Sequence, residues 1–509
     1  MAKDSPARNC AVITEETVAA ARARMKDAAQ VADMIEIRLD YLRDFDFTKP
    51  EDLSSLLEDK ALPVIITCRS VAEGGRQAID DQIRLRLLVE GARNGADYCD
   101  IEATHYDQAA SLAPDPSRLI LSHHNFQETP PDLFEIYYRQ SRQPAAVHKI
   151  VTQANSVIDT LSIFHLLKRA REEGQNLIAL AMGEPGVITR ILGPAAGGYL
   201  TYGSLARGAE SAPGQLTCRE LQQTYRVHQL SRETTITGII GRPVSQSASP
   251  AMHNAAFQEC GLDFVYLPIE VDDLEQFFVQ FVREESREFD WQLRGLSVTI
   301  PYKTAVIPML DEVDETARDI GAVNTVVIEH DCLKGYNTDV EGAIKPLEKV
   351  CSIKGESFGV IGAGGAARAV LYGLQNRGAR VTLFARDTDR ARGLADSAGV
   401  EVYPINALDS SHVRVIINTT PVGMRGHDEG SSPVRSAAFR GRLAAYDLVY
   451  NPMETKFLKD AREEGCQTIS GIEMLVAQGA RQFEMWTARK APTDLMFAAA
   501  LEKLDSQSR

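Results

Sequence analysis

Residues 10–205 alternate short segments rich in β-branched and other apolar residues with amphipathic stretches. After an opening CAVIT, the β-rich segments read MIEIRLD, PVIITCRS, ADYCDIEA, SRLILSHHNF, AAVHKIVT, NLIALAMG and GGYLTYGS. Regular alternation of strand and helix predicts a parallel sheet, and about eight such units in roughly 210 residues predict a closed (β/α)8 barrel. We therefore expect an α/β protein that begins with a barrel.

The chain of 509 residues is too long for one domain. The polar residues 218–234 are expected to form a helix and a linker before a new strand, TITGIIG. A second α/β part extends to about residue 340, and ESFGVIGAGGAARAVLYGL opens a third with a strand, a glycine turn and a helix. The expected boundaries are 8–222, 235–340, 341–478, and 479–505 for a C-terminal helix that returns to the second part.

Composition excludes several classes of function. No apolar run reaches the roughly 20 residues that cross a bilayer, and a net charge of -15 with dispersed arginines argues against nucleic acid and favours small polar substrates. The eight cysteines lack metal-ligand spacing, so we expect reduced thiols and no metal. The polar start, MAKDSPAR, lacks an apolar signal core, which predicts the cytoplasm, or a plastid if a transit peptide has been removed.

Lys149 lies in an apolar strand, where an ammonium is costly unless it is paired or functional. A lysine near a strand end can also simply reach solvent. However, the carboxyl ends of barrel strands face a single mouth, and further polar residues end other strands there: Glu36, Arg38, Arg69, Glu102 and His124. A neutral lysine amine forms Schiff bases, and Arg38, Arg69 and Arg190 are cations that would favour the neutral amine.

His124 is a candidate proton shuttle because imidazole titrates near neutral pH, although a lone histidine is usually structural. Glu102 would hold its tautomer, as a carboxylate commonly does. The adjacent His123 is expected to face the other side of the strand. These residues predict imine chemistry assisted by one histidine.

Residues 8–222 resemble the type I 3-dehydroquinate dehydratases through EIRLD, CRS with EGG, DIE, SHHNF, HKI, GVITR and SAPGQ, in that order. The resemblance implies that Lys149 forms an imine with 3-dehydroquinate, that His124 moves the proton with Glu102 behind it, and that 3-dehydroshikimate is released without a metal. It also implies a carboxylate-binding set of Arg190, Ser211 and Gln215, and ring-hydroxyl contacts from Glu36, Arg38 and Arg69. Asn125 stands where many bacterial relatives carry Asp, and plant-like relatives also read HN.

GVIGAGGAARAV fits G-x-G-x-x-A through Gly362, Gly364 and Ala367, between a strand and a helix. Where NAD enzymes place an acid, the strand VTLFAR ends in Arg386, with Arg390 close by. Two arginines suit a 2′-phosphate and favour NADP(H) over NAD, with solvated surface arginines as the less favoured alternative. The expected cofactor contacts are Gly362, Ala363, Gly364, Gly365, Ala366, Arg386 and Arg390, with Asn418 and Thr419 lining the cleft.

Residues 235–505 resemble the shikimate dehydrogenase family through SQSASP, GLSVTIPYK, GAVNTV, GYNTDVEG, NTTPVGM, LVYNP and GIEMLVAQGARQF. The resemblance implies a substrate-binding α/β domain, a Rossmann NADP-binding domain, and a catalytic pair of Lys303 and Asp339. Lys303 would give a proton to the forming alkoxide or only position the substrate, and Asp339 would orient it. Implied substrate contacts are Ser247, Ser249, Thr299, Asn324, Tyr450, Gln478 and Gln482. Ser297 replaces an asparagine common in bacterial relatives, which leaves its own contact open.

Together the two resemblances predict a plant-like fusion that converts 3-dehydroquinate to 3-dehydroshikimate and then, with NADPH, to shikimate. A regulatory sensor, like the fungal quinate-pathway repressors that resemble this pair of enzymes, is one alternative. The intact Lys149, His124, Lys303 and Asp339 argue against it. A dehydrogenase half that prefers quinate with NAD is another alternative, and the hydroxyls of Ser247 and Thr299 favour shikimate instead. The oligomeric state is not indicated.

Overall fold

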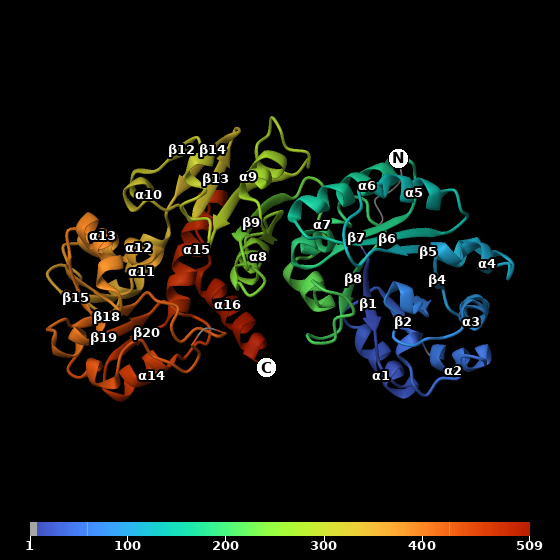
Figure 1. Ribbon diagram of the computed structural model, residues 1–509, viewed down its shortest axis with the longest axis horizontal. Coiled ribbons are helices and arrows are strands. Elements are labelled where there is room, and N and C mark those ends of the chain that lie inside the picture. The colour runs from blue at the N-terminus through green and yellow to red at the C-terminus, as the bar shows by residue number, and fades with distance from the viewer. Residues whose placement is uncertain (1–7, 59, 427, 509) are drawn as a thin grey trace. The chain divides into compact units, whose positions relative to one another are not determined.

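The structure is a computed structural model that describes residues 8–58, 60–426 and 428–508. The segment MAKDSPA, part of the polar start, lies outside the described residues. The chain divides into two compact units (Figure 1). The first contains Met1–Thr235 and Leu267–Gln292, and the second contains Ile236–Tyr266 and Leu293–Arg509.

The first unit contains the predicted barrel. Its parallel strands are β1 (Asn9–Ile13), β2 (Met34–Arg38), β3 (Val64–Thr67), β4 (Tyr98–Glu102), β5 (Leu119–His124), β6 (Val147–Gln153), β7 (Leu177–Met182) and β8 (Thr201–Ser204). Hydrogen-bonded neighbours follow the order β7-β6-β5-β4-β3-β2-β1-β8. The ring closes where Tyr199 N, just before β8, donates to Leu177 O in β7.

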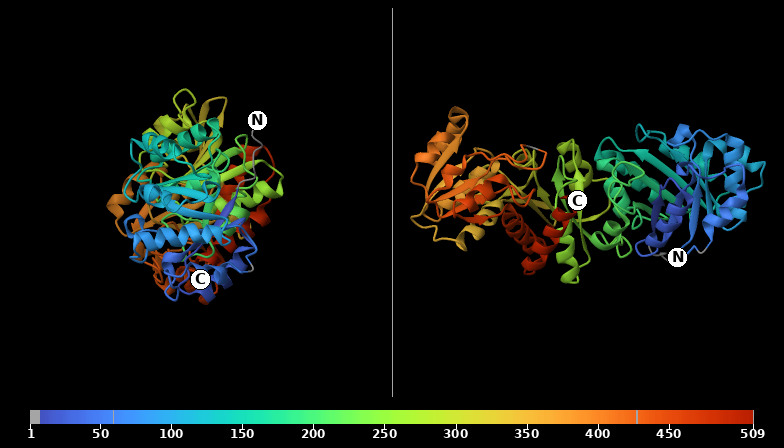
Figure 2. Two further views of the ribbon diagram at one scale, coloured as in Figure 1. Left: turned by 90° about the vertical axis from the view of Figure 1, so that its right-hand side faces the viewer. Right: turned by 90° about the horizontal axis from the view of Figure 1, so that it is seen from below.

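Helices cover the outside of this strand ring, as Figures 1 and 2 show. They are α1 (Val18–Ala28), α2 (Leu53–Leu57), α3 (Asp81–Arg93), α4 (Tyr106–Ala110), α5 (Leu133–Ser141), α6 (Thr160–Glu172) and α7 (Val187–Leu192). Alternate strand residues point to opposite faces, so two apolar cores form. One fills the ring with side chains such as Val12, Ile65 and Leu180, and the other packs strands on helices through Ile37, Leu53 and Leu88.

The polar segment 218–234 begins with a short helix, as expected. Residues 218–219 are α-helical, the π-helix Glu220–Thr224 follows, and turns lead to the next strand. Tyr225 N closes the π-helix on Glu220 O at 2.9 Å, and Val227 N bonds to Leu221 O at 3.0 Å. Both Tyr225 and Val227 are buried, so the segment packs against its own unit.

The second part of the chain holds a mixed sheet of order β10-β9-β11-β13-β14-β12. Its strands are β9 (Thr235–Gly241), β10 (Phe264–Glu270), β11 (Gln292–Val298), β12 (Glu312–Val313), β13 (Thr325–Glu329) and β14 (Cys332–Tyr336). The helices in this region are α8 (Ser249–Glu259), α9 (Leu274–Phe277), α10 (Glu315–Ile320) and α11 (Asp339–Glu348).

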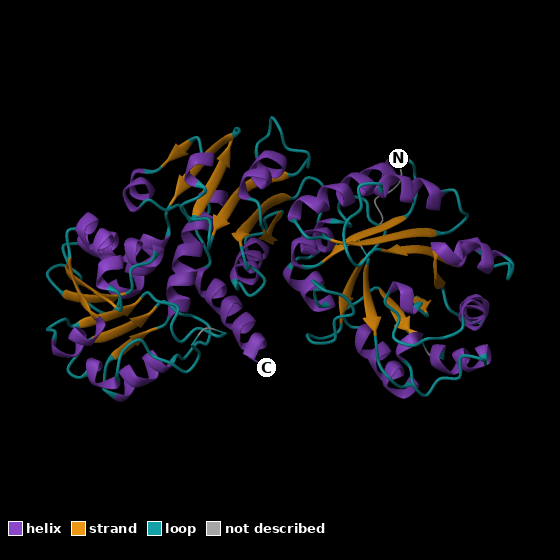
Figure 3. Ribbon diagram, viewed as in Figure 1, coloured by secondary structure: helices purple, strands orange, loops and turns teal. Residues whose placement is uncertain are grey.

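A third sheet is wholly parallel, with the order β17-β16-β15-β18-β19-β20 (Figure 3). Its strands are β15 (Ser357–Ile361), β16 (Arg380–Ala385), β17 (Glu401–Pro404), β18 (Val415–Asn418), β19 (Ala444–Asp447) and β20 (Gln467–Ile469), and its helices are α12 (Gly365–Gln375), α13 (Thr388–Ala398) and α14 (Lys456–Glu463). The strand order reverses direction between β15 and β18, which is the switch point where doubly wound folds bind nucleotides.

Helix α15 (Gly471–Thr487) connects the third sheet with the mixed one, and α16 (Thr493–Ser508) follows it. The expected boundary at 478/479 falls inside α15, so a single helix serves both domains. Trp486 near its end donates from Nε1 to Val326 O in β13 at 3.1 Å. In Figure 1, α16 lies beside α8, and Leu504 and Met252 belong to one apolar core.

Candidate active sites

The carboxyl ends of the barrel strands surround a small cavity of about 80 Å³. Its lining includes most of the residues predicted for this mouth: Glu36, Arg38, Arg69, His124, Lys149, Arg190, Ser211 and Gln215. Glu73, Phe126, Tyr202 and several apolar side chains also line it. Arg38 and His124 end their strands, and Glu36 and Lys149 lie inside β2 and β6. Arg190 comes from α7, and Ser211 and Gln215 come from the loop after β8.

Lys149 is buried at the centre of this cavity, with only 4% of its surface exposed. Its Nζ donates to Asp100 Oδ2 at 2.9 Å and lies 3.7 Å from Glu36 Oε2. The amine also lies 4.5 Å from the centre of the Tyr202 ring. The charged groups nearest to the amine are therefore two carboxylates, besides the arginines named from the sequence, because β4 and β2 also place acidic side chains inside the ring.

Asp100 links the lysine to Arg69. Its Oδ1 lies 2.9 Å from Arg69 NH2 and accepts a hydrogen bond from Ser122 Oγ at 2.6 Å. Burial alone would raise the pKa of Asp100, but Arg69 and Lys149 outweigh burial and hold it below its usual range. The cavity floor is thus a compensated network of ions rather than a set of isolated charges.

His124 contacts a different carboxylate from the one predicted. Its Nδ1 lies 2.9 Å from Glu73 Oε2, on the turn that follows β3. Burial, together with Arg69 and Lys149, holds the pKa of His124 well below its ordinary value of 6.5. Burial also raises the pKa of Glu73 to about 7, partly opposed by Arg69. The pair therefore resists full ionisation.

Glu102 makes no bond to His124 within the described residues, and this corrects the predicted orienting contact. Its Oε2 accepts from Arg84 NH1 on α3 at 2.5 Å, and its Oε1 accepts from Ser70 N at 2.9 Å. Burial opposes ionisation, but Arg69 and Arg84 outweigh it and lower the pKa of Glu102. Arg84 is itself buried, so Glu102 is the partner of an internal cation.

Arg190 differs from the other arginines of the cavity. It is 2% exposed, and its Nε has no hydrogen-bond partner in the described part of the chain. One NH2 contact to Pro213 O, at 3.5 Å, is long, and no carboxylate pairs with the group among the described ranges. Burial lowers its pKa to about 10. By contrast, Arg38 forms a two-pronged pair with Asp40 at 2.9 and 2.8 Å.

Ser211 and Gln215 lie next to this arginine in the cavity wall. Gln215 Oε1 accepts from Ser211 N at 2.7 Å and from Ser211 Oγ at 3.2 Å, which leaves the amide nitrogen as the donor side of the glutamine. A carboxylate needs donors in this arrangement, and Arg190 supplies them as well. His123, whose neighbours include Arg139, does not line this cavity.

The second site is a cavity of about 210 Å³. It contains all nine residues predicted for the reaction and its substrate: Ser247, Ser249, Thr299, Lys303, Asn324, Asp339, Tyr450, Gln478 and Gln482. Ser297, Ala366 and Met474 also line it. The residues come from the mixed sheet, from the glycine-turn helix α12 and from α15, which places substrate and cofactor sides in one space.

Lys303 Nζ donates to Asp339 Oδ2 at 2.5 Å. The other oxygen of Asp339 accepts from Asn324 Nδ2 at 2.8 Å. Asp339 is the first residue of α11, where the helix dipole favours a carboxylate. Asn324 therefore fixes the carboxylate plane, and the carboxylate fixes the ammonium at the edge of the cavity.

The turn between β15 and α12 leaves room for a phosphate. Gly362 has φ +104°, and a Cβ there would lie 2.9 Å from Thr419 Oγ1, so only glycine fits. A Cβ at Gly364 or Gly365 would meet nothing within 4 Å, which leaves open space in front of the helix N-terminus. Ala363 belongs to the same turn.

Arg386 and Arg390 follow β16 and are both exposed. Neither guanidinium pairs with a carboxylate in the described ranges, so both stay available. Asn418 is fully buried, with Nδ2 bonded to Asp447 Oδ1 at 2.9 Å and Oδ1 accepting from Thr420 N at 3.0 Å. Its amide therefore shapes the loop and is not exposed to the cleft.

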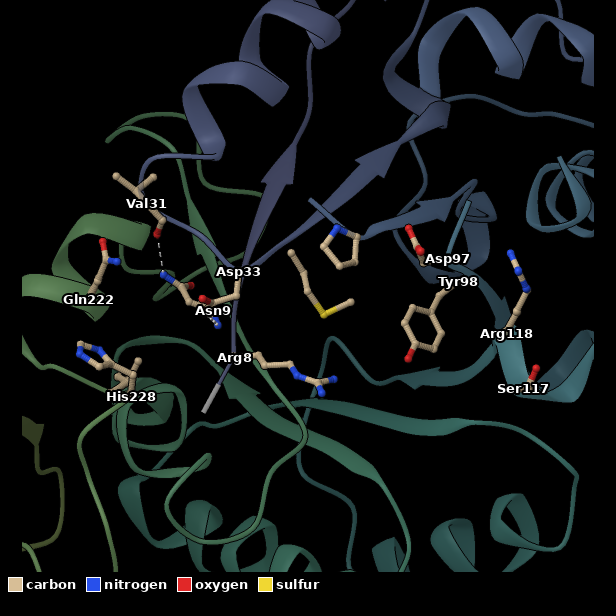
Figure 4. A pocket seen from close by; sticks show the side chains of 13 residues that line it. Arg8, Asn9, Val31, Asp33, Asp97, Tyr98, Ser117, Arg118, Gln222 and His228 are labelled. Carbon is tan, nitrogen blue, oxygen red and sulfur yellow. Dashed lines mark hydrogen bonds between the residues drawn. The ribbon is translucent and has the colours of Figure 1, made fainter. Parts of the chain in front are cut away.

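The opposite, amino-terminal end of the barrel contains a larger depression of about 810 Å³ (Figure 4). Its acidic side chains are engaged locally: Asn9 N donates to Asp33 Oδ2 at 2.8 Å, and Val64 N donates to Asp97 Oδ2 at 2.8 Å. Arg118 bonds to two backbone carbonyls, at 3.0 and 2.9 Å. These bonds join strand starts to loops, which is a stabilising arrangement rather than a reactive one.

No group of three or more His, Cys, Asp or Glu side chains suited to a metal ion occurs within the described residues. Among the described helices, none combines the length and apolar character needed to span a bilayer.

Comparison with known protein families matches both halves of the chain. The family model described as type I 3-dehydroquinase matches residues 9–232. The shikimate dehydrogenase substrate binding domain matches residues 239–326, and the shikimate 5'-dehydrogenase C-terminal domain matches residues 471–501.

Individual relatives give the same division. The chloroplastic bifunctional 3-dehydroquinate dehydratase/shikimate dehydrogenase of Arabidopsis thaliana is 37% identical over 489 residues, which cover 91% of this chain and 79% of that protein. A shikimate dehydrogenase (NADP(+)) of Methanosphaera stadtmanae is 38% identical over 54% of this chain and 98% of its own.

A crystal structure of a shikimate dehydrogenase in complex with NADP+ is 35% identical, covers 54% of this chain and 98% of its own, and gives a TM-score of 0.50. Matching family models on both halves, and a relative aligned along nine-tenths of the chain, show that this protein belongs to the family of bifunctional 3-dehydroquinate dehydratase/shikimate dehydrogenases.

Proposed function

We propose that the two cavities catalyse consecutive steps of the shikimate pathway. The barrel dehydrates 3-dehydroquinate to 3-dehydroshikimate, and the second unit reduces 3-dehydroshikimate to shikimate with NADPH. The observation that carries the first activity is a buried lysine beside a buried arginine that has no carboxylate partner in the described residues. Such a guanidinium is costly to keep unpaired unless it receives an anionic ligand.

In the barrel, Lys149 is the nucleophile for the substrate ketone. Its amine must first release a proton, and Asp100 Oδ2 at 2.9 Å is the nearest acceptor. The nitrogen then adds to the carbonyl carbon, the proton held by Asp100 returns to the carbinolamine hydroxyl, which leaves as water, and the resulting iminium acidifies the adjacent carbon. Arg190, Ser211 and Gln215 hold the substrate carboxylate, while Glu36, Arg38 and Arg69 face its ring.

His124 removes the proton from that carbon and returns it to the departing hydroxyl. We assign Glu73, rather than Glu102, as the group that holds its Nδ1, because the two atoms lie 2.9 Å apart. This leaves Nε2 for the substrate. Hydrolysis of the conjugated iminium releases 3-dehydroshikimate and regenerates the amine.

In the second site, Lys303 donates the proton that the substrate carbonyl oxygen needs as it becomes an alkoxide. Asp339 Oδ2, 2.5 Å from Nζ, holds the ammonium in place and is oriented by Asn324. NADPH, when bound, supplies the hydride. Ser247, Ser249, Thr299, Tyr450, Gln478 and Gln482 position the substrate at the same cavity.

The glycine turn Gly362–Ala366 receives the dinucleotide pyrophosphate at the start of α12, with Thr419 beside it. Arg386 and Arg390, both exposed and without a carboxylate partner in the described ranges, bind the 2′-phosphate and favour NADPH over NADH. Asn418 contributes through its loop, since its amide is occupied by Asp447 and Thr420.

The cellular compartment is proposed to be reducing. All eight cysteines lie in the described residues and are free thiols, and five of them are buried. This fits the cytoplasm or a plastid, where disulfides are rare.

Borohydride trapping tests the imine assignment. Sodium borohydride added with 3-dehydroquinate should reduce the iminium and leave one substrate-derived adduct on the peptide that contains Lys149, detected by mass spectrometry. Lys149→Ala should abolish the adduct, and Lys168→Ala, which changes an exposed lysine of the same barrel, should not. An adduct that persists in Lys149→Ala would refute the assignment. A regulatory sensor would bind substrate without turnover.

A further inference from the structure

Tyr266 is a fully buried tyrosine of β10 that lies behind the second cavity and does not line it. Its hydroxyl donates to Ser297 Oγ at 2.8 Å. Ser297 in turn donates to Gln482 Oε1 at 2.8 Å. Ser249 is a second side-chain hydrogen-bond partner of the Tyr266 hydroxyl. Ser249, Ser297 and Gln482 all line the cavity, so Tyr266 reaches the substrate space through two serines, of which Ser297 continues to Gln482.

The amide of Gln482 is also fixed from its other end. Its Nε2 donates to Asn324 O at 3.2 Å and to Thr325 Oγ1 at 2.9 Å. A primary amide has two N–H hydrogens, so both are committed. What Gln482 offers the cavity is the remaining lone pair of Oε1, an acceptor.

The direction of the serine bond follows from the tyrosine. Tyr266 donates its phenol hydrogen to Ser297 Oγ, so Ser297 cannot direct its own hydrogen back to the tyrosine. Ser297 donates that hydrogen to Gln482 Oε1. Ser297 then also presents only a lone pair to the cavity. We call Ser297 Oγ and Gln482 Oε1 together the acceptor wall.

Hydrogen bonds to its backbone and stacking on its ring hold Tyr266 in place. The Asn254 side chain bonds to its backbone twice, accepting from Tyr266 N at 2.8 Å and donating to Tyr266 O at 2.9 Å. The His253 ring stacks on the Tyr266 ring with centroids 4.4 Å apart and planes 7° from parallel. Gly479 of α15 lets α8 approach, because a Cβ there would meet Met252 Cε at 2.3 Å.

The His253 ring that stacks on Tyr266 is uncharged. Neither of its ring nitrogens makes a hydrogen bond within the described part of the chain. Burial lowers the pKa of His253 to about 3, against a smaller opposing effect of the nearby Gln482 side chain. The stack is therefore uncharged at neutral pH, so the orientation of the phenol does not change with protonation there.

We propose that Tyr266 is a positioning residue of the reductase site, which keeps the acceptor wall free of donors so that it selects a substrate hydroxyl and rejects a carboxylate. This inference rests on the reductase activity proposed above. Two acceptors without a donor bind an O–H favourably, whereas they repel a carboxylate or a second carbonyl oxygen. The wall thus fixes which side of the ring, hydroxyl or carboxylate, lies against α15.

Tyr266→Phe removes one oxygen and keeps the ring stacked. The freed Ser297 hydroxyl then turns its hydrogen toward the cavity or away from Gln482. We expect KM for 3-dehydroshikimate to rise about tenfold, with kcat changed less than threefold and KM for NADPH unchanged. The ratio of kcat/KM for the substrate to kcat/KM for the analogue that lacks the hydroxyl bound by the acceptor wall should fall by a similar factor.

A double-mutant cycle separates positioning from packing. In a Ser297→Ala background, Tyr266→Phe should change KM by less than twofold, since the relay is already broken. Tyr446→Phe is the matched control, because Tyr446 is equally buried and its hydroxyl has no partner in the described residues. Dehydratase activity and NADPH binding of each variant report on folding of the two units.

Equal effects of Tyr266→Phe in both backgrounds, or an effect confined to kcat, would overturn the proposal. If Ser297→Ala fails to bind NADPH, the deoxy-analogue preference of Tyr266→Phe alone decides, and an unchanged preference counts against the acceptor wall. Failure of the unmodified protein to reduce 3-dehydroshikimate would instead refute the proposed reductase function, so the two failures are distinguishable.

Discussion

Replacing Arg190 by methionine should make the free barrel more stable and the dehydratase much weaker. Arg190 is 2% exposed, and its Nε has no partner among the described residues. Burial lowers its pKa from the ordinary 12.5 to about 10. Because 1.36 kcal/mol corresponds to one pKa unit, keeping the group charged costs the folded protein about 3 kcal/mol.

The sign follows from the direction of the change. A base whose pKa is lowered on folding binds its proton less tightly in the folded state, so at every pH below about 10 the charged form opposes folding. Methionine fills part of the same space without a charge, and we expect a net gain of about 1–3 kcal/mol after the loss of packing. A bound carboxylate would lose its two-pronged partner, at a cost of about 3 kcal/mol, or a roughly 100-fold higher KM.

Native-state hydrogen exchange of amides in β6 and β7 measures the stability of the barrel, and absorbance of the conjugated product measures KM. Arg169→Met, on the exposed face of α6, is the matched control and should change stability by less than about 0.5 kcal/mol. The reasoning is refuted if Arg190→Met lowers barrel stability while KM for 3-dehydroquinate stays the same.

Three further substitutions test the remaining assignments. Dehydratase kcat/KM should rise with pH through about 7, because ionised Glu73 accepts a hydrogen bond from His124 Nδ1 and leaves Nε2 basic. Glu73→Gln should remove this rise with pH and lower the rate about 100-fold. Glu102→Gln should keep this rise with pH and cost about 2 kcal/mol of stability, because Arg84 loses its buried carboxylate partner and keeps only the half-exposed Asp81. Loss of the rise in Glu102→Gln would restore Glu102 as the orienting group. Arg386→Ala should raise KM for NADPH about tenfold in steady-state assays and leave KM for NADH within twofold; equal losses would show that it does not contact the 2′-phosphate.

The barrel could be predicted because its signal is local. Each β-rich segment is short, apolar and followed by an amphipathic stretch, and each became a strand within a few residues of its expected place. His124 at the end of β5 and Lys149 inside the neighbouring β6 line one cavity, because both side chains point into the strand ring. The second cavity followed from motifs that recur in the family, and its nine predicted residues line one space.

What sequence reasoning missed are partnerships across the ring. Glu102 looks like a histidine partner by position, but Arg84, an ordinary helix arginine in sequence, is buried beneath it and takes its carboxylate. Glu73 is part of EGG, one of the sequence pieces that carry the resemblance, but that piece alone does not indicate a contact with His124. Asp100 could have been found from period-two alternation, which places it on the same strand face as Glu102.

The buried relay behind the reductase cavity has no sequence signal of its own. Tyr266 sits in a strand whose apolar neighbours suggest simple core, and nothing local indicates that its hydroxyl meets Ser297. The contact depends on two strands and one helix packing at a fixed distance, which only the folded chain defines.

Helix α15 is fixed at both of its ends. Its first residue, Gly471, packs on the Leu448 carbonyl at the end of the nucleotide-binding sheet, where a Cβ would come within 2.5 Å of that oxygen. Its last turn is anchored by Trp486 on β13. Over 17 residues the helix spans roughly 25 Å, and a single inserted residue would turn everything beyond it by about 100°. Insertions and deletions should therefore be tolerated in the surrounding loops but not in α15, because this helix sets the separation between hydride donor and substrate.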